Sequence, residues 1–171
     1  VKTVGISKEP VKTMGGLTII PDCAISDIAM NEESVLLLPG ANTWGEPIHG
    51  AIIDKASNLL SAGGMVCAIC GATAALANVG LLDQRLHASN GMGYLEMVSP
   101  RYKGRQYYVD KPSVADQNLI TASSIGALLW AKQIIERLEV FQTDTLEAWY
   151  NYFSSGKEQH FFALMQTLPA N

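Results

Sequence analysis

The chain has 171 residues, of which 48% are apolar and 16% are charged, a composition that supports one folded domain with a buried core. Its formal net charge of -4, with no cluster of Lys and Arg, excludes a phosphate-binding surface for nucleic acid. No apolar run approaches the roughly 18 residues of a membrane helix, and the N-terminus has no signal-peptide pattern. We therefore expect a single domain over residues 1–171, soluble and cytoplasmic, with neither a membrane nor a nucleic acid as partner.

The N-terminal part of the chain predicts short strands followed by a helix. Residues 1–6 alternate in a β-prone pattern, and residues 17–20 form a second strand that ends in a turn, with a hairpin bend at residues 14–16. Residues 34–38 are a continuous apolar run that ends at Pro-Gly, the pattern of a strand buried on both faces of a parallel sheet. Residues 48–62 follow as a helix with one apolar face, which ends before two glycines.

The middle of the chain repeats this order of strand and helix. Residues 65–70 are predicted to be a second buried strand, and residues 72–79 a short alanine-rich helix. Residues 86–109 contain β-prone pieces at 94–98 and 106–109, divided by Gly and Pro, and they predict short strands or a flap.

The last part of the chain is predicted to be mainly helical. Residues 118–121 form a third short strand, and residues 124–138 a strongly amphipathic helix. Residues 145–166 carry aromatic and polar side chains at helical spacing with a break at residues 154–156, which predicts two helices packed on the outside. Strands that alternate with helices predict an α/β sandwich with helices on both faces of the sheet.

Two of the three cysteines, Cys67 and Cys70, have the spacing C-x-x-C. In an extended strand such residues point to opposite faces and lie about 10 Å apart, whereas a disulfide needs Cα atoms within about 7 Å. A redox pair would require the cysteines to start a helix, and a zinc site would need a second pair of ligands. We therefore expect no metal site, a buried Cys67 and free thiols, Cys23 included.

The alternative reading places Cys70 on the sharp turn between the strand and the alanine-rich helix. Gly71 would permit the tight turn, and the first N–H groups of the helix would favour the thiolate form. Such an elbow projects a nucleophile above the carboxyl end of a parallel sheet, where open α/β sheets bind ligands.

Four pieces of the sequence carry a family resemblance. The segment A-I-C-G-A-T-A-A-L-A-N-V-G-L-L-D at residues 68–83 resembles the nucleophile elbow of the DJ-1/PfpI superfamily, a branch of the class I glutamine-amidotransferase-like fold, and residues 15–22, 36–41 and 118–123 match further pieces in the family order. The resemblance covers about residues 1–140. It implies a flavodoxin-like three-layer sandwich with a mostly parallel sheet, a homodimer and no cofactor.

The resemblance also implies site residues. Cys70 matches the nucleophile, and the turn at Gly40 and Ala41 matches the loop whose N–H groups, with that of Gly71, would form an oxyanion hole. The family usually has Gly-Gly at this turn, and alanine is a mild departure because the chemistry uses only the N–H. After this turn, Trp44 and Glu46 are expected either at the pocket rim or on a surface loop.

The chain departs from the family pattern at the partner of the cysteine. Asn90 stands at the position of the family histidine, and an asparagine cannot act as a general base. His87 would replace it only if the register slips, and the alternative is a histidine at the rim or the core edge. We expect His49 to begin a helix and to face the pocket, and His160 to pack among aromatic residues.

A second departure concerns the family glutamate, which follows the first strand. This chain opens at what matches the second strand, and Glu9 lies in the wrong connection to be that residue. Because the first strand of a doubly wound sheet lies between the second and third, we expect roughly 30 to 40 residues before Val1, the length of a βα unit.

Three functions follow as hypotheses. In the first, Cys70 attacks a carbonyl of a small-molecule substrate, as in an amidase or a glyoxalase-like enzyme, and peptidase activity is disfavoured by Asn90. In the second, Cys70 is an oxidation sensor or part of a chaperone-like stress protein without turnover. In the third, the site is vestigial and the fold serves as a binding module.

Overall fold

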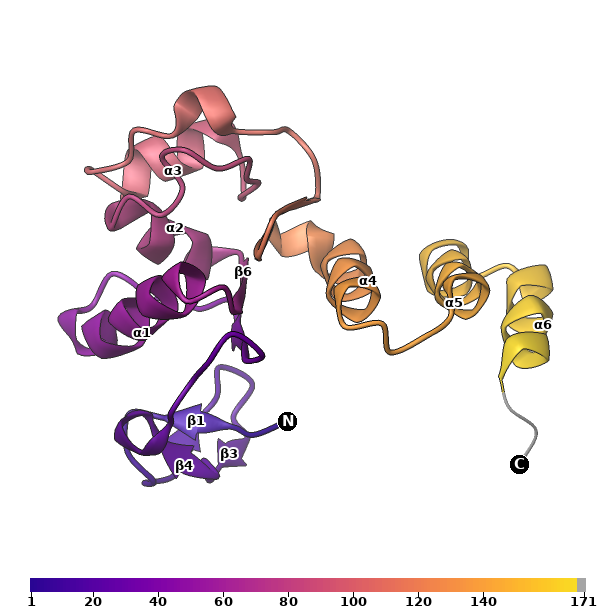
Figure 1. Ribbon diagram of the computed structural model, residues 1–171, viewed down its shortest axis with the longest axis horizontal. Helices are drawn as coiled ribbons and strands as arrows, with labels where there is room; N and C mark the ends of the chain where they lie inside the picture. The colour runs from indigo at the N-terminus through magenta and orange to yellow at the C-terminus, as the bar shows by residue number, and fades with distance from the viewer. Residues whose placement is uncertain (169–171) are drawn as a thin grey trace.

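Four short segments form the central sheet of the computed structural model, which describes residues 1–168 (Figure 1). The strand order is β5-β6-β8-β7, in which β5 (Val35–Leu38), β6 (Met65–Ile69) and β8 (Leu119–Ala122) are parallel and β7 (Ser113–Asp116) is antiparallel to β8. The three parallel strands are the apolar runs that the sequence predicts, while β7 was not expected. β6 and β8 are buried on both faces, which favours apolar residues along their length. β5 is the edge strand and its Leu37 is 44% exposed, so the prediction that this strand is buried on both faces is wrong.

Helices cover both faces of this sheet. The larger core lies on the side of α1 (Gly50–Ser61), where Leu36 and Leu38 of β5 pack with apolar residues of that helix. The opposite face packs on α4 (Ala127–Arg137) through a smaller cluster that includes Cys67. Figure 1 accordingly shows β6 between α1 and α4. The expected three-layer α/β sandwich is confirmed.

The N-terminal segment forms two small sheets of its own. β1 (Val4–Gly5) pairs in parallel with β4 (Cys23–Ala24), and β2 (Val11–Lys12) pairs antiparallel with β3 (Thr18–Ile19). The predicted hairpin bend therefore lies between β2 and β3, and the strand expected over residues 1–6 is shorter than predicted. A short 3-10 turn, η1 (Ile25–Asp27), follows β4.

The segment after α2 (Gly71–Asn78) corrects the sequence prediction. Residues 94–98, expected as a strand, belong to the helix α3 (Met92–Val98). Its Leu95 is fully buried, and the Ser99 hydroxyl at its end donates to the carbonyl of Ala74 in α2 at 3.0 Å. This packing outweighs the weak β propensity of the segment. Residues 106–109 form no named strand: they comprise part of the 3-10 turn η3 (Arg105–Tyr107) and one bridge between His87 and Tyr108.

The C-terminal part forms the two predicted outer helices. They are α5 (Thr143–Ser155) and α6 (Glu158–Thr167), divided at Gly156, and Figure 1 shows them beyond α4, away from the sheet. The Lys132 ammonium of α4 bonds the Glu147 carboxylate of α5 at 2.5 Å and lies 4.9 Å from the ring centroid of Tyr150. These contacts attach the helical hairpin to the sandwich.

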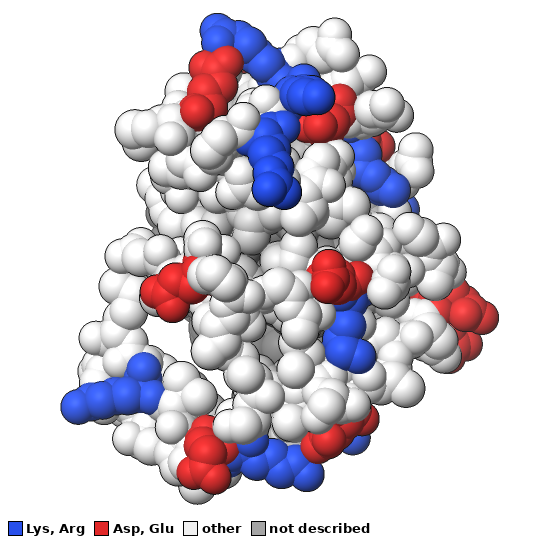
Figure 2. Space-filling view, turned by 90° about the vertical axis from the view of Figure 1, so that its left-hand side faces the viewer, with Lys and Arg blue, Asp and Glu red and all other residues white. Residues whose placement is uncertain are grey.

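Charge is dispersed over the face of the molecule that Figure 2 shows. Basic and acidic side chains are interspersed there, separated by uncharged surface. None of the helices in residues 1–168 combines the length and the apolar character needed to cross a bilayer.

Candidate active site

Cys70 occupies a strained turn between β6 and α2. Its backbone has φ 57 and ψ -124, an unusual conformation for a residue with a side chain, and such strain costs on the order of 1 to 3 kcal/mol. The N–H of Cys70 donates to the carbonyl of Ala122 at 2.9 Å, while its own carbonyl accepts from the N–H and the hydroxyl of Thr73 at 3.1 and 2.6 Å. The end of β8 and the first turn of α2 therefore hold the elbow in place, and its half-buried side chain lies at the carboxyl edge of the sheet.

The turn after β5 packs directly against this elbow. A Cβ on Gly71 would lie 2.1 Å from the carbonyl oxygen of Ala41, and a Cβ on Gly40 would lie 3.0 Å from the Cβ of Cys70. A side chain at Gly71 is excluded, because real Cβ atoms essentially never come under 3.0 Å of another heavy atom, whereas one at Gly40 would make a tight contact that requires Cys70 to shift slightly. The structure thus brings together Gly40, Ala41, Gly71 and Cys70, as the sequence predicts.

Cys67 lies on the opposite face of β6. It is fully buried beside Met65, Ile120 and Ile134, and burial raises the pKa of its thiol to about 12. All three cysteines are free thiols, and within residues 1–168 no three His, Cys, Asp or Glu side chains gather closely enough to hold a metal ion. The two cysteines of the C-x-x-C spacing therefore belong to different environments.

Asn90 contacts the sulfur of Cys70. Its side-chain Nδ2 donates to Cys70 Sγ at 3.4 Å, and its Oδ1 accepts from the backbone N–H of Ser124 at 2.8 Å. Because a backbone N–H can only donate, the contact with Ser124 identifies the oxygen of the amide, and the NH2 group must face the cysteine. The position that matches the family histidine thus supplies a hydrogen-bond donor to the sulfur.

Tyr94 is a neighbour of this pair that sequence analysis missed. Burial raises the pKa of Tyr94, and its proximity to Cys70 raises the pKa further, whereas a hydrogen bond with the Asn90 side chain lowers it. The ring packs against the main core cluster. The sequence offered no clear signal for this contact, because Asn90 precedes α3 and only Tyr94 belongs to that helix.

His87 is engaged elsewhere. It is fully buried, with Nδ1 2.7 Å from the carbonyl oxygen of Arg85 and Nε2 2.7 Å from the hydroxyl of Tyr102. A carbonyl only accepts, so Nδ1 carries the proton and Nε2 accepts from the tyrosine. Burial lowers the pKa of His87. A catalytic His87 has no geometric support, because both ring nitrogens are occupied inside the core, deeper than the expected rim or core edge.

Trp44 fixes the loop after the Gly40 turn. Its Nε1 donates to the carbonyl of Pro39 at 2.8 Å, and its ring centroid lies 5.2 Å from that of His49. Glu46 is exposed, and His160 is half-buried on α6. Trp44 therefore acts on the shape of the loop, which begins at the Gly40–Ala41 turn.

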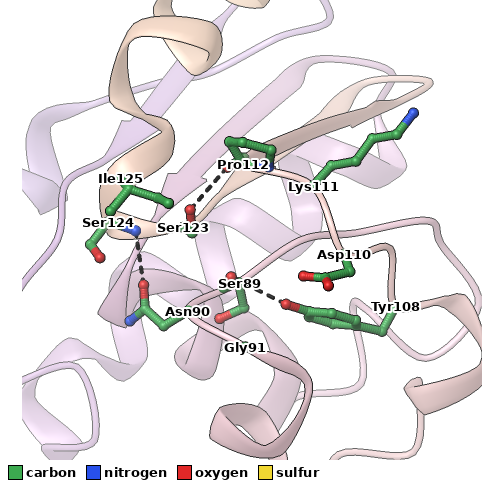
Figure 3. Close-up of a pocket in the computed structure, with 10 residues that line it drawn as sticks. All are labelled: Ser89, Asn90, Gly91, Tyr108, Asp110, Lys111, Pro112, Ser123, Ser124 and Ile125. Carbon is green, nitrogen blue, oxygen red and sulfur yellow. Dashed lines mark hydrogen bonds between the residues drawn. The ribbon is translucent and has the colours of Figure 1, made fainter.

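A cavity of about 240 Å³ lies on the β8 side of Cys70. Asn90 forms part of its wall, and Trp44 and Glu46 are not among its lining residues. Figure 3 shows Asn90 bonded to Ser124 and the hydroxyl of Tyr108 directed to the carbonyl of Ser89, at 3.3 Å. The lining residues are Ser89, Asn90, Gly91, Tyr108, Asp110, Lys111, Pro112, Ser123, Ser124 and Ile125.

Two curated proteins are similar in sequence to this chain over most of its length. The protein named uncharacterized protease YoaZ of Bacillus subtilis is 45% identical over 168 residues, which cover 98% of this chain and 80% of that protein. The protein named glutathione-independent glyoxalase DJR-1.2 of Caenorhabditis elegans is 26% identical over 140 residues, which cover 79% of this chain and 71% of that protein.

A solved structure and a family model agree with these relatives. The crystal structure of a thiJ/pfpI family protein from Bacillus anthracis superposes with a TM-score of 0.94 at 44% identity, covering 96% of this chain and 78% of that chain. The model of the DJ-1/PfpI family matches residues 1–137, which include the elbow and the segments that surround it. The chain therefore belongs to the DJ-1/PfpI family.

Proposed function

We propose that this protein is an enzyme that acts on small carbonyl compounds, with Cys70 as the nucleophile. The observation that carries the proposal is the strained, half-buried elbow at Cys70, at the carboxyl edge of a parallel sheet. Cys70 does not itself line the cavity, but its sulfur bonds Asn90, which does. Strain of this kind concentrates at functional sites, where the surrounding structure maintains it. A structural cysteine would need no such backbone, as Cys67 demonstrates.

The oxygen of the reacting carbonyl would be held by backbone N–H groups of Gly40, Ala41 and Gly71. The close approach of the turn to the elbow supports this role, since it keeps these amides next to Cys70. Donors fixed before the reaction stabilise the negative charge that develops on the oxygen, and removal of one such donor in other enzymes costs about 10²- to 10³-fold in rate.

The partner of Cys70 favours aldehydes over peptides as substrates. Hydrolysis of an amide requires proton delivery to the leaving amine, and Asn90 has no titratable proton. Addition of a thiolate to an aldehyde has no leaving group. With methylglyoxal, a proton then moves from C1 to C2 by way of water to give a lactoyl thioester, and water hydrolyses that thioester to lactate, with the thiolate leaving without needing a proton. One relative is named a glyoxalase, so 2-oxoaldehydes are the first substrates to test.

The experiment is a turnover assay with methylglyoxal and, separately, with small amides. We expect formation of lactate by the natural protein, loss of that activity in Cys70→Ala, and full activity in Cys23→Ala, which makes the same change outside the site. Activity that persists in Cys70→Ala, or a natural protein with no turnover of either class, would overturn the proposal.

A specific observation also favours a second function, that of an oxidation sensor. Cys70 is half-buried rather than enclosed, and Asn90 places an N–H donor at its sulfur, where it would stabilise an oxidised sulfinate. Mass spectrometry after mild peroxide treatment would show two added oxygen atoms on Cys70 alone. Such selective oxidation together with no turnover would favour the sensor.

We also propose that the protein forms a homodimer, on the basis of the family resemblance. Light scattering coupled to size-exclusion chromatography would test it, and a monomer at micromolar concentration would contradict it.

A further inference from the structure

Ser89 joins the turn at Cys70 to the segment that carries Asn90. Its side chain is 2% exposed, and its hydroxyl oxygen lies 2.7 Å from that of Thr73. Ser89 directly precedes Asn90, whose amide donates to Cys70 Sγ at 3.4 Å, and both residues line the cavity (Figure 3). One buried contact therefore connects the elbow with the segment whose next residue bonds its sulfur.

The direction of each hydrogen bond in this contact follows from the donors present. The hydroxyl of Thr73 has a single hydrogen, which it donates to the carbonyl of Cys70 at 2.6 Å, because a carbonyl can only accept. The hydroxyl of Ser89 must then donate to the oxygen of Thr73. Two hydroxyls thus form a chain that runs from Ser89 through Thr73 to the strained backbone of Cys70.

The bond from Ser89 differs in kind from the bond that Thr73 makes. A threonine in a helix commonly bonds a carbonyl three or four residues earlier, so the bond from Thr73 to Cys70 is an ordinary local one. Ser89 lies 16 residues after Thr73, in a different segment of the chain. Both side chains are buried, and a buried hydroxyl that loses its partner is costly, so this contact fixes the spacing of the two segments.

The segment around Ser89 is held by β8 on its other side. The N–H of Ala88 donates to the hydroxyl of Thr121 at 2.9 Å, and Oδ1 of Asn90 accepts from the N–H of Ser124 at 2.8 Å. These bonds tie the segment to β8 and to the residues that follow it, whereas the hydroxyl of Ser89 ties it to the first turn of α2. Ser89 therefore controls how close the segment stays to the elbow.

We propose that Ser89 is a positioning residue, which keeps the amide of Asn90 at the sulfur of Cys70 through its bond to Thr73. The inference rests on the proposed function only in taking Cys70 as the reacting group. Donation from an amide N–H stabilises a negatively charged sulfur, so the proportion of thiolate depends on where the amide of Asn90 lies. Without the hydroxyl of Ser89 the segment is free to shift, and the thiolate forms only at higher pH.

The test is the rate at which iodoacetamide alkylates Cys70 as a function of pH, read by peptide mass spectrometry, which requires no turnover. In Ser89→Ala we expect the pH of half-maximal rate to rise by about 0.5 to 1 unit. This shift corresponds to about threefold to tenfold in the ratio of thiolate to thiol, the range for the loss of one hydrogen bond.

Ser99→Ala is the matched control. The hydroxyl of Ser99 is also buried and also bonds α2, since it donates to the carbonyl of Ala74 at 3.0 Å. Among the described residues, however, it bonds neither the elbow nor Asn90. The loss of a buried hydroxyl is thus similar in both variants, and the profile of Ser99→Ala should match that of the natural protein.

Two substitutions at Thr73 break or keep the same contact from its other end. Thr73→Val removes the hydroxyl and should raise the pH of half-maximal rate, whereas Thr73→Ser retains the hydroxyl and should keep the natural profile. This pair carries the test if Ser89→Ala does not fold. In a protein that already carries Asn90→Ala, Ser89→Ala should cause no further rise, because the amide that it positions is absent.

Three results would contradict the role of Ser89 and leave the proposed function standing. They are an unchanged profile in Ser89→Ala and Thr73→Val, an equal shift in Ser99→Ala, and additive shifts when Ser89→Ala is combined with Asn90→Ala. A natural protein that turns over no substrate, with the profiles shifted as expected, would instead overturn the proposed function and support the positioning of Asn90 by Ser89.

Discussion

The buried histidine predicts how the stability of this protein depends on pH. His87 is fully buried as the neutral tautomer, and burial lowers its pKa below the ordinary value of 6.5. Above pH 6.5 the residue is neutral in the folded and the unfolded chain, so it causes no pH dependence. As the pH falls below 6.5, His87 binds a proton in the unfolded chain but not in the folded chain. The free energy of unfolding therefore decreases until the pH reaches the pKa that His87 has in the folded protein.

The maximum slope follows from one proton. A single group that is protonated only in the unfolded state reduces the free energy of unfolding by about 1.4 kcal/mol per pH unit. Exposed Asp22 and Asp27 have a pKa lowered from 3.8, so they lose their contribution only at lower pH. Between pH 7.5 and pH 5.5, the change in the free energy of unfolding therefore reports the titration of His87 and not that of these carboxylates.

The assay is urea denaturation at several pH values over this range, for the natural protein and for His87→Gln. The substitution should remove most of the slope and lower the stability at pH 7.5 by about 1 to 3 kcal/mol, because the hydroxyl of Tyr102 loses its buried acceptor. His160→Gln makes the same change on α6 and should keep the slope of the natural protein. An unchanged slope in His87→Gln would refute the reasoning.

Three further predictions concern the elbow. Iodoacetamide should label Cys70 in the folded protein and leave Cys67 unlabelled, since that thiol is fully buried with a pKa raised to about 12, and peptide mass spectrometry reads both sites. Gly71→Ala should destabilise the fold by about 1 to 3 kcal/mol and abolish turnover, because the new Cβ would lie 2.1 Å from a backbone oxygen. Gly45→Ala places its Cβ in open space, so it should change neither the melting temperature nor the activity. Asn90→His supplies a base at the sulfur and should raise the release of ammonia from small amides, an increase that Asn90→Ala should not produce.

Sequence analysis predicts the parts of the fold in which the pattern of apolar residues along the chain matches their burial in the structure. The run at Met65–Ile69 is apolar because both of its faces are covered, and the run at Val35–Leu38 is apolar because Leu36 and Leu38 pack in the main core, although Leu37 is exposed. The elbow at Cys70 was predictable because a buried strand, a glycine and a helix follow each other directly. These features need no knowledge of distant segments.

The remaining features depend on contacts that a sequence does not display. The piece at residues 94–98 has β-prone residues, yet it is helical because Leu95 is buried against α2. His87 is buried only because a carbonyl two residues earlier and the hydroxyl of Tyr102 satisfy both of its nitrogens. Propensity is too weak to compete with such tertiary contacts.

The contacts around Cys70 explain what an asparagine does at the position of the family histidine. The sulfur of Cys70 faces an amide N–H, and the turn at Gly40 and Ala41 packs against the elbow. Within residues 1–168 the side chain that bonds the sulfur is thus a donor and not a base. A site of this kind stabilises negative charge on sulfur and on substrate oxygen, whereas it offers little to a reaction that must move a proton onto a leaving amine. Under the proposed function, Asn90 therefore favours reversible addition to an aldehyde over peptide hydrolysis.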